Sequence, residues 1–151
     1  MCKEHGNFLM RDSGLMIDTT FPMFAASPDG VGTCDCHGEG LLEVKCTYKH
    51  RDLFVSDIPD CDSQFCLAKN TLTLKENHKY YSQVQFQMSM CQKQFCDFVV
   101  FTEKGIFNKT IYYKSLYVRE LTDRCTAFAF SHLLPSLIVK KMEGEDNEIE
   151  K

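Results

Sequence analysis

The chain has 151 residues, of which 44% are hydrophobic and 12% aromatic, and its formal net charge is −4. This composition excludes a disordered chain, and the length allows one domain with a single core. The charge excludes a protein that coats nucleic acid by bulk positive charge, but it does not exclude an enzyme that acts on nucleic acid.

The sequence has no apolar run long enough to span a bilayer, and its first residues lack the apolar stretch of a signal peptide. We therefore expect an intracellular protein, nuclear or cytoplasmic, that is not attached to a membrane. In a reducing compartment the nine cysteines are expected to be free thiols, several of them buried.

The first third of the chain predicts short strands. Residues 15–18 and 21–27 each predict a strand, and the second ends at Pro28-Asp29-Gly30, where proline and glycine turn the chain. The Gly-rich segment that follows is interpreted as a hairpin loop. Residues 41–46 (LLEVKC) then predict a third strand.

The middle of the chain is expected to change from irregular to helical structure. We expect one or two helical turns at 51–56, a loop at 58–63 and a short strand at 71–75. A helix is predicted from Asn77, which can cap it. Its expected core positions are Tyr81, Val84, Met88 and Cys91, and its neighbouring polar face carries Tyr80, Gln83 and Gln87.

The last third predicts two strands, 95–102 and 106–113, and a helix over 115–142 that Pro135 should kink or break. The predicted fold is therefore α/β, a mixed central sheet flanked by helices. We expect an N-terminal segment at 1–13, one domain at 14–142 and a flexible acidic tail at 143–151.

Asp29, Glu43 and Lys45 form the pattern that indicates chemistry. Side chains alternate along a strand, so Glu43 and Lys45 project from the same face. Two adjacent strands can bring the carboxylates of Asp29 and Glu43 to one Mg²⁺ ion, with the carbonyl of Val44 as a further ligand. Lys45 can then orient an attacking water or offset charge on a phosphate. The alternative is a turn followed by a surface ion pair.

The segment FAASPDGVGTCDCHGEGLLEVKC and the later HKYYSQVQFQM resemble two ordered motifs of the YqaJ-like viral recombinase family. That family is a lambda-exonuclease-like group within the PD-(D/E)xK nuclease superfamily. The stretch CDFVV and the tripeptide LLP near residue 134 resemble further family positions. The resemblance extends over about residues 14–139 and implies a restriction-endonuclease-like core.

The resemblance implies a Mg²⁺-dependent exonuclease, with Mn²⁺ as a possible substitute, that digests linear double-stranded DNA from its 5′ ends. It implies that Asp29, Glu43 and the carbonyl of Val44 bind metal and that Lys45 assists the water. It implies that Tyr80 and Gln83 flank the catalytic centre and that Ser27 helps to hold a 5′ phosphate. Asp18 lies near another acidic family position. Family relatives also imply a ring trimer and a single-strand annealing partner.

Family members carry an upstream helix with a glutamate and an arginine that reach the site, and residues 1–13 show no such motif. The sequence therefore also fits a fragment, an incomplete gene product, or a transposon- or virus-derived remnant. Such a remnant would bind DNA or protein on the same fold without efficient catalysis.

Two other groups have a functional and a structural interpretation. Cys34-x-Cys36-His37 fits a zinc site, but no second pair with zinc-ligand spacing is present, so ordinary thiols are the preferred interpretation. The basic residues Lys49, His50 and Arg51 could follow a DNA backbone, or could form a solvated loop.

Overall fold

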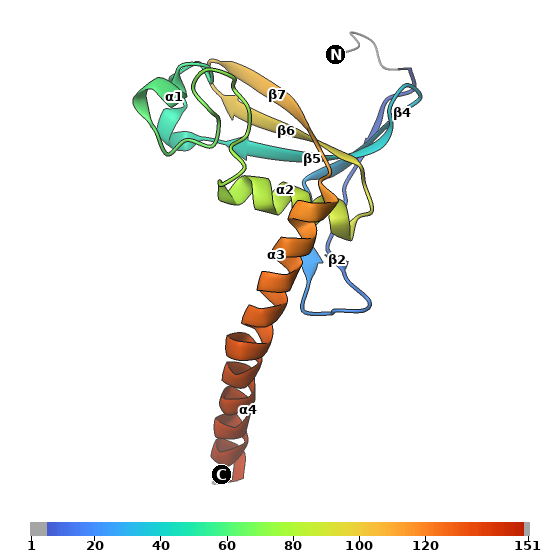
Figure 1. The fold of residues 1–151 in the computed structure, drawn as a ribbon, viewed down its shortest axis with the longest axis vertical. Coiled ribbons are helices and arrows are strands. Elements are labelled where there is room, and N and C mark those ends of the chain that lie inside the picture. The colour runs from blue at the N-terminus through green and yellow to red at the C-terminus, as the bar shows by residue number, and fades with distance from the viewer. Residues whose placement is uncertain (1–5, 150–151) are drawn as a thin grey trace. The chain divides into compact units, whose positions relative to one another are not determined.

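The computed structural model describes residues 6–149, with side chains described up to residue 142. The chain divides into two compact units, one that ends at Lys114 and one that begins at Ser115. The described strands all belong to the first unit, and the second is helical (Figure 1). In the part of the chain described, no helix is both long and apolar enough to cross a membrane.

A five-stranded mixed sheet forms the centre of the first unit, in the order β1-β4-β5-β6-β7. β5 and β6 are parallel, and the other neighbouring pairs are antiparallel. The strands of this sheet are β1 (Leu9–Arg11), β4 (Gly30–Cys34), β5 (Gly38–Cys46), β6 (Phe95–Thr102) and β7 (Gly105–Tyr112).

Two strands of this sheet, β1 and β4, were not predicted from the sequence. The segment interpreted as a hairpin loop is largely strand, because the backbone of β4 pairs with β5 on one side and with β1 on the other. The loop proper is confined to residues 35–37. Glycine has low strand propensity, so the sequence pattern around Gly30 and Gly32 did not predict a strand. Pairing with the two neighbouring strands stabilises β4.

One face of the sheet is covered by α2 (Lys79–Met90), which runs along β5 and β6 (Figure 1). The parallel register places Leu41, Glu43 and Lys45 beside Cys96, Phe98 and Val100, so all six share one face. The helix contributes Val84 and Met88 to the same core, and both are fully buried. Two charged residues of β5 therefore lie on the covered face of the sheet.

A small hairpin of β2 (Met16–Ile17) and β3 (Ala25–Ala26) leads into the turn that carries Asp29. It packs against α2 through an edge-on contact between Phe24 and Phe86, whose ring centroids lie 5.4 Å apart. The predicted strand at 21–27 is thus shorter than expected.

Between β5 and α2 the predicted elements are partly wrong. A 3-10 helix spans Tyr48–His50, and α1 spans Ile58–Cys61, where a loop was expected. Pro59 lies in the first turn of α1, where its missing N–H breaks no hydrogen bond. The strand predicted at 71–75 is reduced to one bridge between Leu67 and Leu74.

α2 begins one residue later than predicted. His78, not Asn77, is its N-cap, and the His78 Nδ1 accepts a hydrogen bond from the Tyr80 N–H at 3.2 Å. Burial, followed by the charges of Lys79 and Lys75, lowers the pKa of His78. The lowered pKa favours the neutral imidazole, and only the neutral ring can accept this bond.

The second unit contains α3 (Ser115–Phe128), a π-helical turn (Ala129–Leu133) and α4 (Leu134–Ile149). The predicted interruption at Pro135 takes the form of this π turn, because proline lacks the N–H that the regular helical bond needs. The predicted flexible tail, 143–151, has no described side chains and ends outside the described residues, so it stays a prediction.

Gly40 in β5 offers a test of this packing. A Cβ at Gly40 would lie 2.1 Å from the Phe95 ring, which covers the glycine from the neighbouring strand. Gly40→Ala should lower the free energy of unfolding by about 1–3 kcal/mol, measured by urea denaturation. Gly32→Ala, whose Cβ would meet nothing closer than 3.4 Å, is the matched control and should cost less.

In a Phe95→Ala background the obstacle is gone, and Gly40→Ala should then be neutral or stabilising, since alanine loses less backbone entropy than glycine. An equal cost of Gly40→Ala in both backgrounds would contradict the packing of Phe95 on Gly40.

Candidate active site

Asp29 lies immediately before β4, at the point where the pairing between β4 and β5 ends. The last pair in that register is Gly30 with Leu42. Beyond it the edge of β5 is open, and the Asp29 Oδ2 accepts a hydrogen bond from the Val44 N–H at 2.7 Å. The carbonyl of a strand residue points to the same side as its N–H, so the Val44 carbonyl faces this open edge as well.

Glu43 is the most deeply buried charged residue among those described, with 2% of its surface exposed. Its Oε1 accepts a hydrogen bond from the Gln83 amide at 2.7 Å, and its Oε2 accepts one from the Gln87 amide at 2.8 Å. Lys45 forms an ion pair with Oε1. A buried carboxylate without such donors would be strongly destabilising, so these contacts make its burial possible.

Gln83 and Gln87 reach the same carboxylate because they lie one helical turn apart on α2. The Gln87 amide nitrogen also approaches the Ser27 carbonyl at 3.5 Å, which links the helix to the turn before Asp29. The Gln87 Oε1 is buried and has no hydrogen-bond partner among the described residues. An acceptor in this position can accept a hydrogen bond from a bound water.

Lys45 is held from two directions. Its ammonium contacts Glu43 on one side and lies over the Tyr80 ring on the other, 4.7 Å from the ring centroid. Its side chain keeps 21% of its surface exposed. The Tyr80 ring is itself fixed by His78, whose ring centroid lies 4.7 Å away.

The structure brings together most of the residues singled out from the sequence. Contacts link Asp29 to Val44, Gln83 and Lys45 to Glu43, and Tyr80 to Lys45. Ser27 is exposed beside them, and only its carbonyl has a described contact, to Gln87. The roles proposed for these residues stay predictions.

Gln87 was not among the predicted site residues. The signal that could have found it is the spacing Gln83-x-x-x-Gln87, which places both amides on the face that also carries Tyr80. A glutamine on a polar helix face is most often solvated, so this spacing alone did not separate Gln87 from a surface residue.

Asp18 lies outside this group. Its Oδ1 accepts hydrogen bonds from the backbone N–H groups of Thr20 and Phe21, at 2.7 and 2.8 Å. It therefore stabilises the turn between β2 and β3. None of its described contacts reaches Asp29 or Glu43.

The basic group after β5 is engaged in local structure. Lys49 pairs with Asp62 at 2.7 Å, and His50 is buried with its Nε2 3.2 Å from the same carboxylate. Arg51 stacks over the Tyr48 ring at 4.4 Å. His50 is buried and therefore fits neither a track for DNA nor a solvated loop, whereas Lys49 is exposed and Arg51 half-buried, and both interpretations of them stay predictions.

The residues at the open edge of β5 fit a hard divalent cation. Asp29 and Glu43 carry two negative charges, and Lys45 is the single described cation that pairs with either of them. Both carboxylates and the Val44 carbonyl are oxygen donors, which Mg²⁺ and Mn²⁺ prefer. The unpartnered Gln87 Oε1 matches the need of a hydrated cation for acceptors around its waters.

The buried thiols next to the site have a different character. Burial raises the pKa of Cys96, and the Glu43 carboxylate adds to the rise. Burial likewise raises the pKa of Cys66 to about 11. Both stay protonated at neutral pH and are poor nucleophiles. The eight cysteines within residues 6–149 are free thiols.

These features define an α/β protein with a restriction-endonuclease-like core, in which an acidic residue before one strand meets a Glu-x-Lys pair on the next. Residues 3–94 match the YqaJ-like viral recombinase domain. The match covers more than half of the chain and includes β4, β5 and α2, so the chain belongs to this family. No curated protein matches the chain significantly.

Two similar solved structures are those of an alkaline exonuclease, LHK-Exo, from Laribacter hongkongensis. The first is 24% identical in sequence with a TM-score of 0.64. The second, a complex with dAMP, is 23% identical with the same TM-score. In each case the alignment covers 91% of this chain and 64% of the other. The chain thus spans less than two thirds of the length of these relatives, and at this identity the likeness shows a shared fold.

The ion pair between Lys45 and Glu43 predicts a specific pattern of stabilities. Lys45→Met leaves the buried Glu43 without its cation and should lower the free energy of unfolding by about 1–3 kcal/mol in urea denaturation without added metal. In a Glu43→Gln background the same substitution should cost clearly less, because the neutral amide needs no cation.

Lys93→Met is the matched control. Lys93 is about as exposed as Lys45, but its partner Glu39 has 32% of its side-chain surface exposed and also pairs with Arg11. Lys93→Met should therefore lower the free energy of unfolding less than Lys45→Met does. Lys45 would not compensate the charge of Glu43 if both lysine substitutions lowered the free energy of unfolding equally. The same conclusion would follow if the cost of Lys45→Met were unchanged in the Glu43→Gln background.

Proposed function

We propose that this chain is the catalytic core of a Mg²⁺-dependent DNA nuclease that hydrolyses phosphodiester bonds of linear double-stranded DNA from 5′ ends. The observation that carries the proposal is the convergence of Asp29, Glu43 and Lys45 at the open edge of β5, in a chain of the YqaJ-like family. A similar fold occurs in a protein described as an alkaline exonuclease.

The proposed roles follow from the chemistry of each group. Asp29, Glu43 and the Val44 carbonyl would hold the cation. When bound, the cation would neutralise charge on the scissile phosphate and make a coordinated water more acidic. Lys45, held between Glu43 and Tyr80, would place its ammonium where charge develops on the phosphate oxygens.

The remaining groups would position the reacting ones. Gln83 and Gln87 hold both oxygens of Glu43 and so fix the orientation of the carboxylate. Ser27, exposed beside Asp29, would offer its hydroxyl to a 5′ phosphate. We also propose that the chain assembles into a ring trimer and cooperates with a single-strand annealing protein, as the family resemblance implies.

A degradation assay on linear duplex DNA tests the proposal. The protein should release nucleotides with Mg²⁺ or Mn²⁺ and none with EDTA. Glu43→Gln and Lys45→Ala should each lower the rate about a hundredfold or more. Glu39→Gln, on the same strand but paired with surface cations, is the matched control and should keep nearly full activity.

The direction of degradation is tested with duplex substrates labelled at the 5′ or the 3′ end. A covalently closed circle tests whether a DNA end is needed. Early loss of the 5′ label with the circle left intact is the expected result. A protein that binds the duplex without degrading it under any of these conditions would instead be a non-catalytic descendant of the fold, and the enzyme proposal would fail.

Tyr80 gives a second, finer prediction. If its role is to present a ring face to the Lys45 ammonium, then Tyr80→Phe keeps that face and should lower kcat no more than about threefold. Tyr80→Leu removes the face and should lower kcat about tenfold. A large loss in Tyr80→Phe would show instead that the hydroxyl itself takes part in the reaction.

A further inference from the structure

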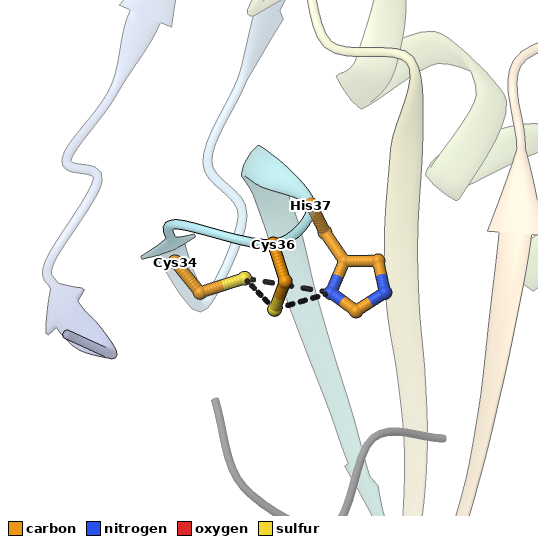
Figure 2. Close-up of side chains that lie close together, drawn as sticks. All are labelled: Cys34, Cys36 and His37. Carbon is orange, nitrogen blue, oxygen red and sulfur yellow. Dashed lines mark hydrogen bonds between the residues drawn. The ribbon is translucent and has the colours of Figure 1, made fainter. Parts of the chain in front are cut away.

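A cluster of sulfur and nitrogen donors lies at the tip of the hairpin between β4 and β5. Cys34 ends β4, and Cys36 and His37 belong to the loop before β5. The ligand atoms of these three residues all lie within 4.8 Å of one another, and Figure 2 shows the three side chains turned toward one point. The sequence alone left this group as ordinary thiols, because it lacked a second pair of cysteines.

The distances between the three ligand atoms are close to those around a bound zinc ion. The two Sγ atoms are 3.4 Å apart, and the His37 Nδ1 lies 3.5 Å from the Cys34 Sγ and 3.0 Å from the Cys36 Sγ. Zinc bonds of about 2.3 Å to sulfur and 2.0–2.1 Å to nitrogen place ligand atoms of a tetrahedron about 3.5–3.8 Å from one another. The distances of 3.4 and 3.5 Å lie at or just below the lower end of that range, and a small rotation of the Cys36 or His37 side chain would lengthen the third, which is 3.0 Å.

The backbone explains why the donors converge. Asp35 points away from the cluster, because its carboxylate accepts a hydrogen bond from the Asn7 side chain at 2.7 Å and its N–H donates to the Gly6 carbonyl at 3.1 Å. The side chains on either side of it, Cys34 and Cys36, instead contact each other and the His37 ring. Gly38, with φ at +74°, then turns the chain into β5.

We propose that Cys34, Cys36 and His37 bind a zinc ion that clamps the β4-β5 hairpin. Two thiolates and an imidazole nitrogen are the donors that zinc selects, and they differ in kind from the oxygen donors at Asp29 and Glu43. Binding releases the two thiol protons to solvent as the sulfurs become ligands. The fourth position of the tetrahedron is taken by water or by a donor outside the described residues.

This zinc site is separate from the candidate active site but mechanically connected to it. Five residues of strand carry the chain from Asp29 to Cys34, about 16 Å at the usual rise per residue. The hairpin joins the strand that follows Asp29 to the strand that carries Glu43. A clamp at its tip would therefore fix the register that brings the two carboxylates together at the other end.

The test measures metal in the whole protein, purified under reducing conditions without a metal-affinity tag. We expect one zinc per chain in the wild type and less than about a tenth of that in Cys36→Ser and in His37→Ala. Cys61→Ser, which changes another exposed cysteine, should keep full zinc and is the matched control. Zinc-free wild type, or equal loss in Cys61→Ser, overturns the site.

Cobalt substitution gives a readout that does not depend on nuclease activity. Replacing zinc by Co²⁺ should produce intense thiolate-to-metal absorption in wild type and in Glu43→Gln, and none in Cys36→Ser. No thiolate absorption in the wild type, or absorption kept at full intensity in Cys36→Ser, would contradict the proposal. Because Glu43→Gln should lower cleavage about a hundredfold and keep the absorption, the zinc site and the nuclease proposal can fail separately.

A chelator should also lower the melting temperature of the wild type by about 5 °C or more, with no effect on Cys36→Ser. The proposal would equally be overturned by a disulfide between Cys34 and Cys36 in protein kept with a reductant and supplied with zinc. Such a disulfide is detected by mass spectrometry as the loss of two hydrogens.

Discussion

The buried carboxylate of Glu43 is the constraint on which the rest of the site depends. It lies on the face of the sheet that α2 covers, with 2% of its surface exposed. An isolated charge in such a place would cost several kcal/mol, so the fold has to supply donors to it. Two come from consecutive turns of α2 and one from Lys45 on the same strand.

The donors that Glu43 requires also hold neighbouring parts of the chain in place. The Gln87 amide that donates to Glu43 also approaches the Ser27 carbonyl, so the helix holds the turn that presents Asp29. Asp29 in turn satisfies the Val44 N–H at the point where β4 no longer covers the edge of β5. Lys45 is the single described cation that pairs with either acidic group, and the other donors are neutral, so one negative charge is left for a metal cation to offset.

Local patterns predicted which of these side chains lie together. Alternation along β5 placed Glu43 and Lys45 on one face, and helical spacing placed Tyr80 and Gln83 together; the register with β6 and the contacts to Glu43 confirm both. β4 was missed because its glycines have low strand propensity, although β5 pairs with it across a loop of only three residues; its other partner, β1, is distant in sequence. The loop that carries Cys36 and His37 is held in part by contacts of Asp35 with residues 6 and 7, which no local pattern reveals.

The proposed chemistry requires Asp29 and Glu43 to share one hard cation. Anomalous diffraction from crystals grown with Mn²⁺ locates such an ion without relying on activity. We expect a peak at about 2.0–2.3 Å from a carboxylate oxygen of each residue and from the Val44 carbonyl. A peak elsewhere, or none, with Asp29 still bonded to the Val44 N–H and Glu43 still occupied by Lys45, Gln83 and Gln87, would contradict it.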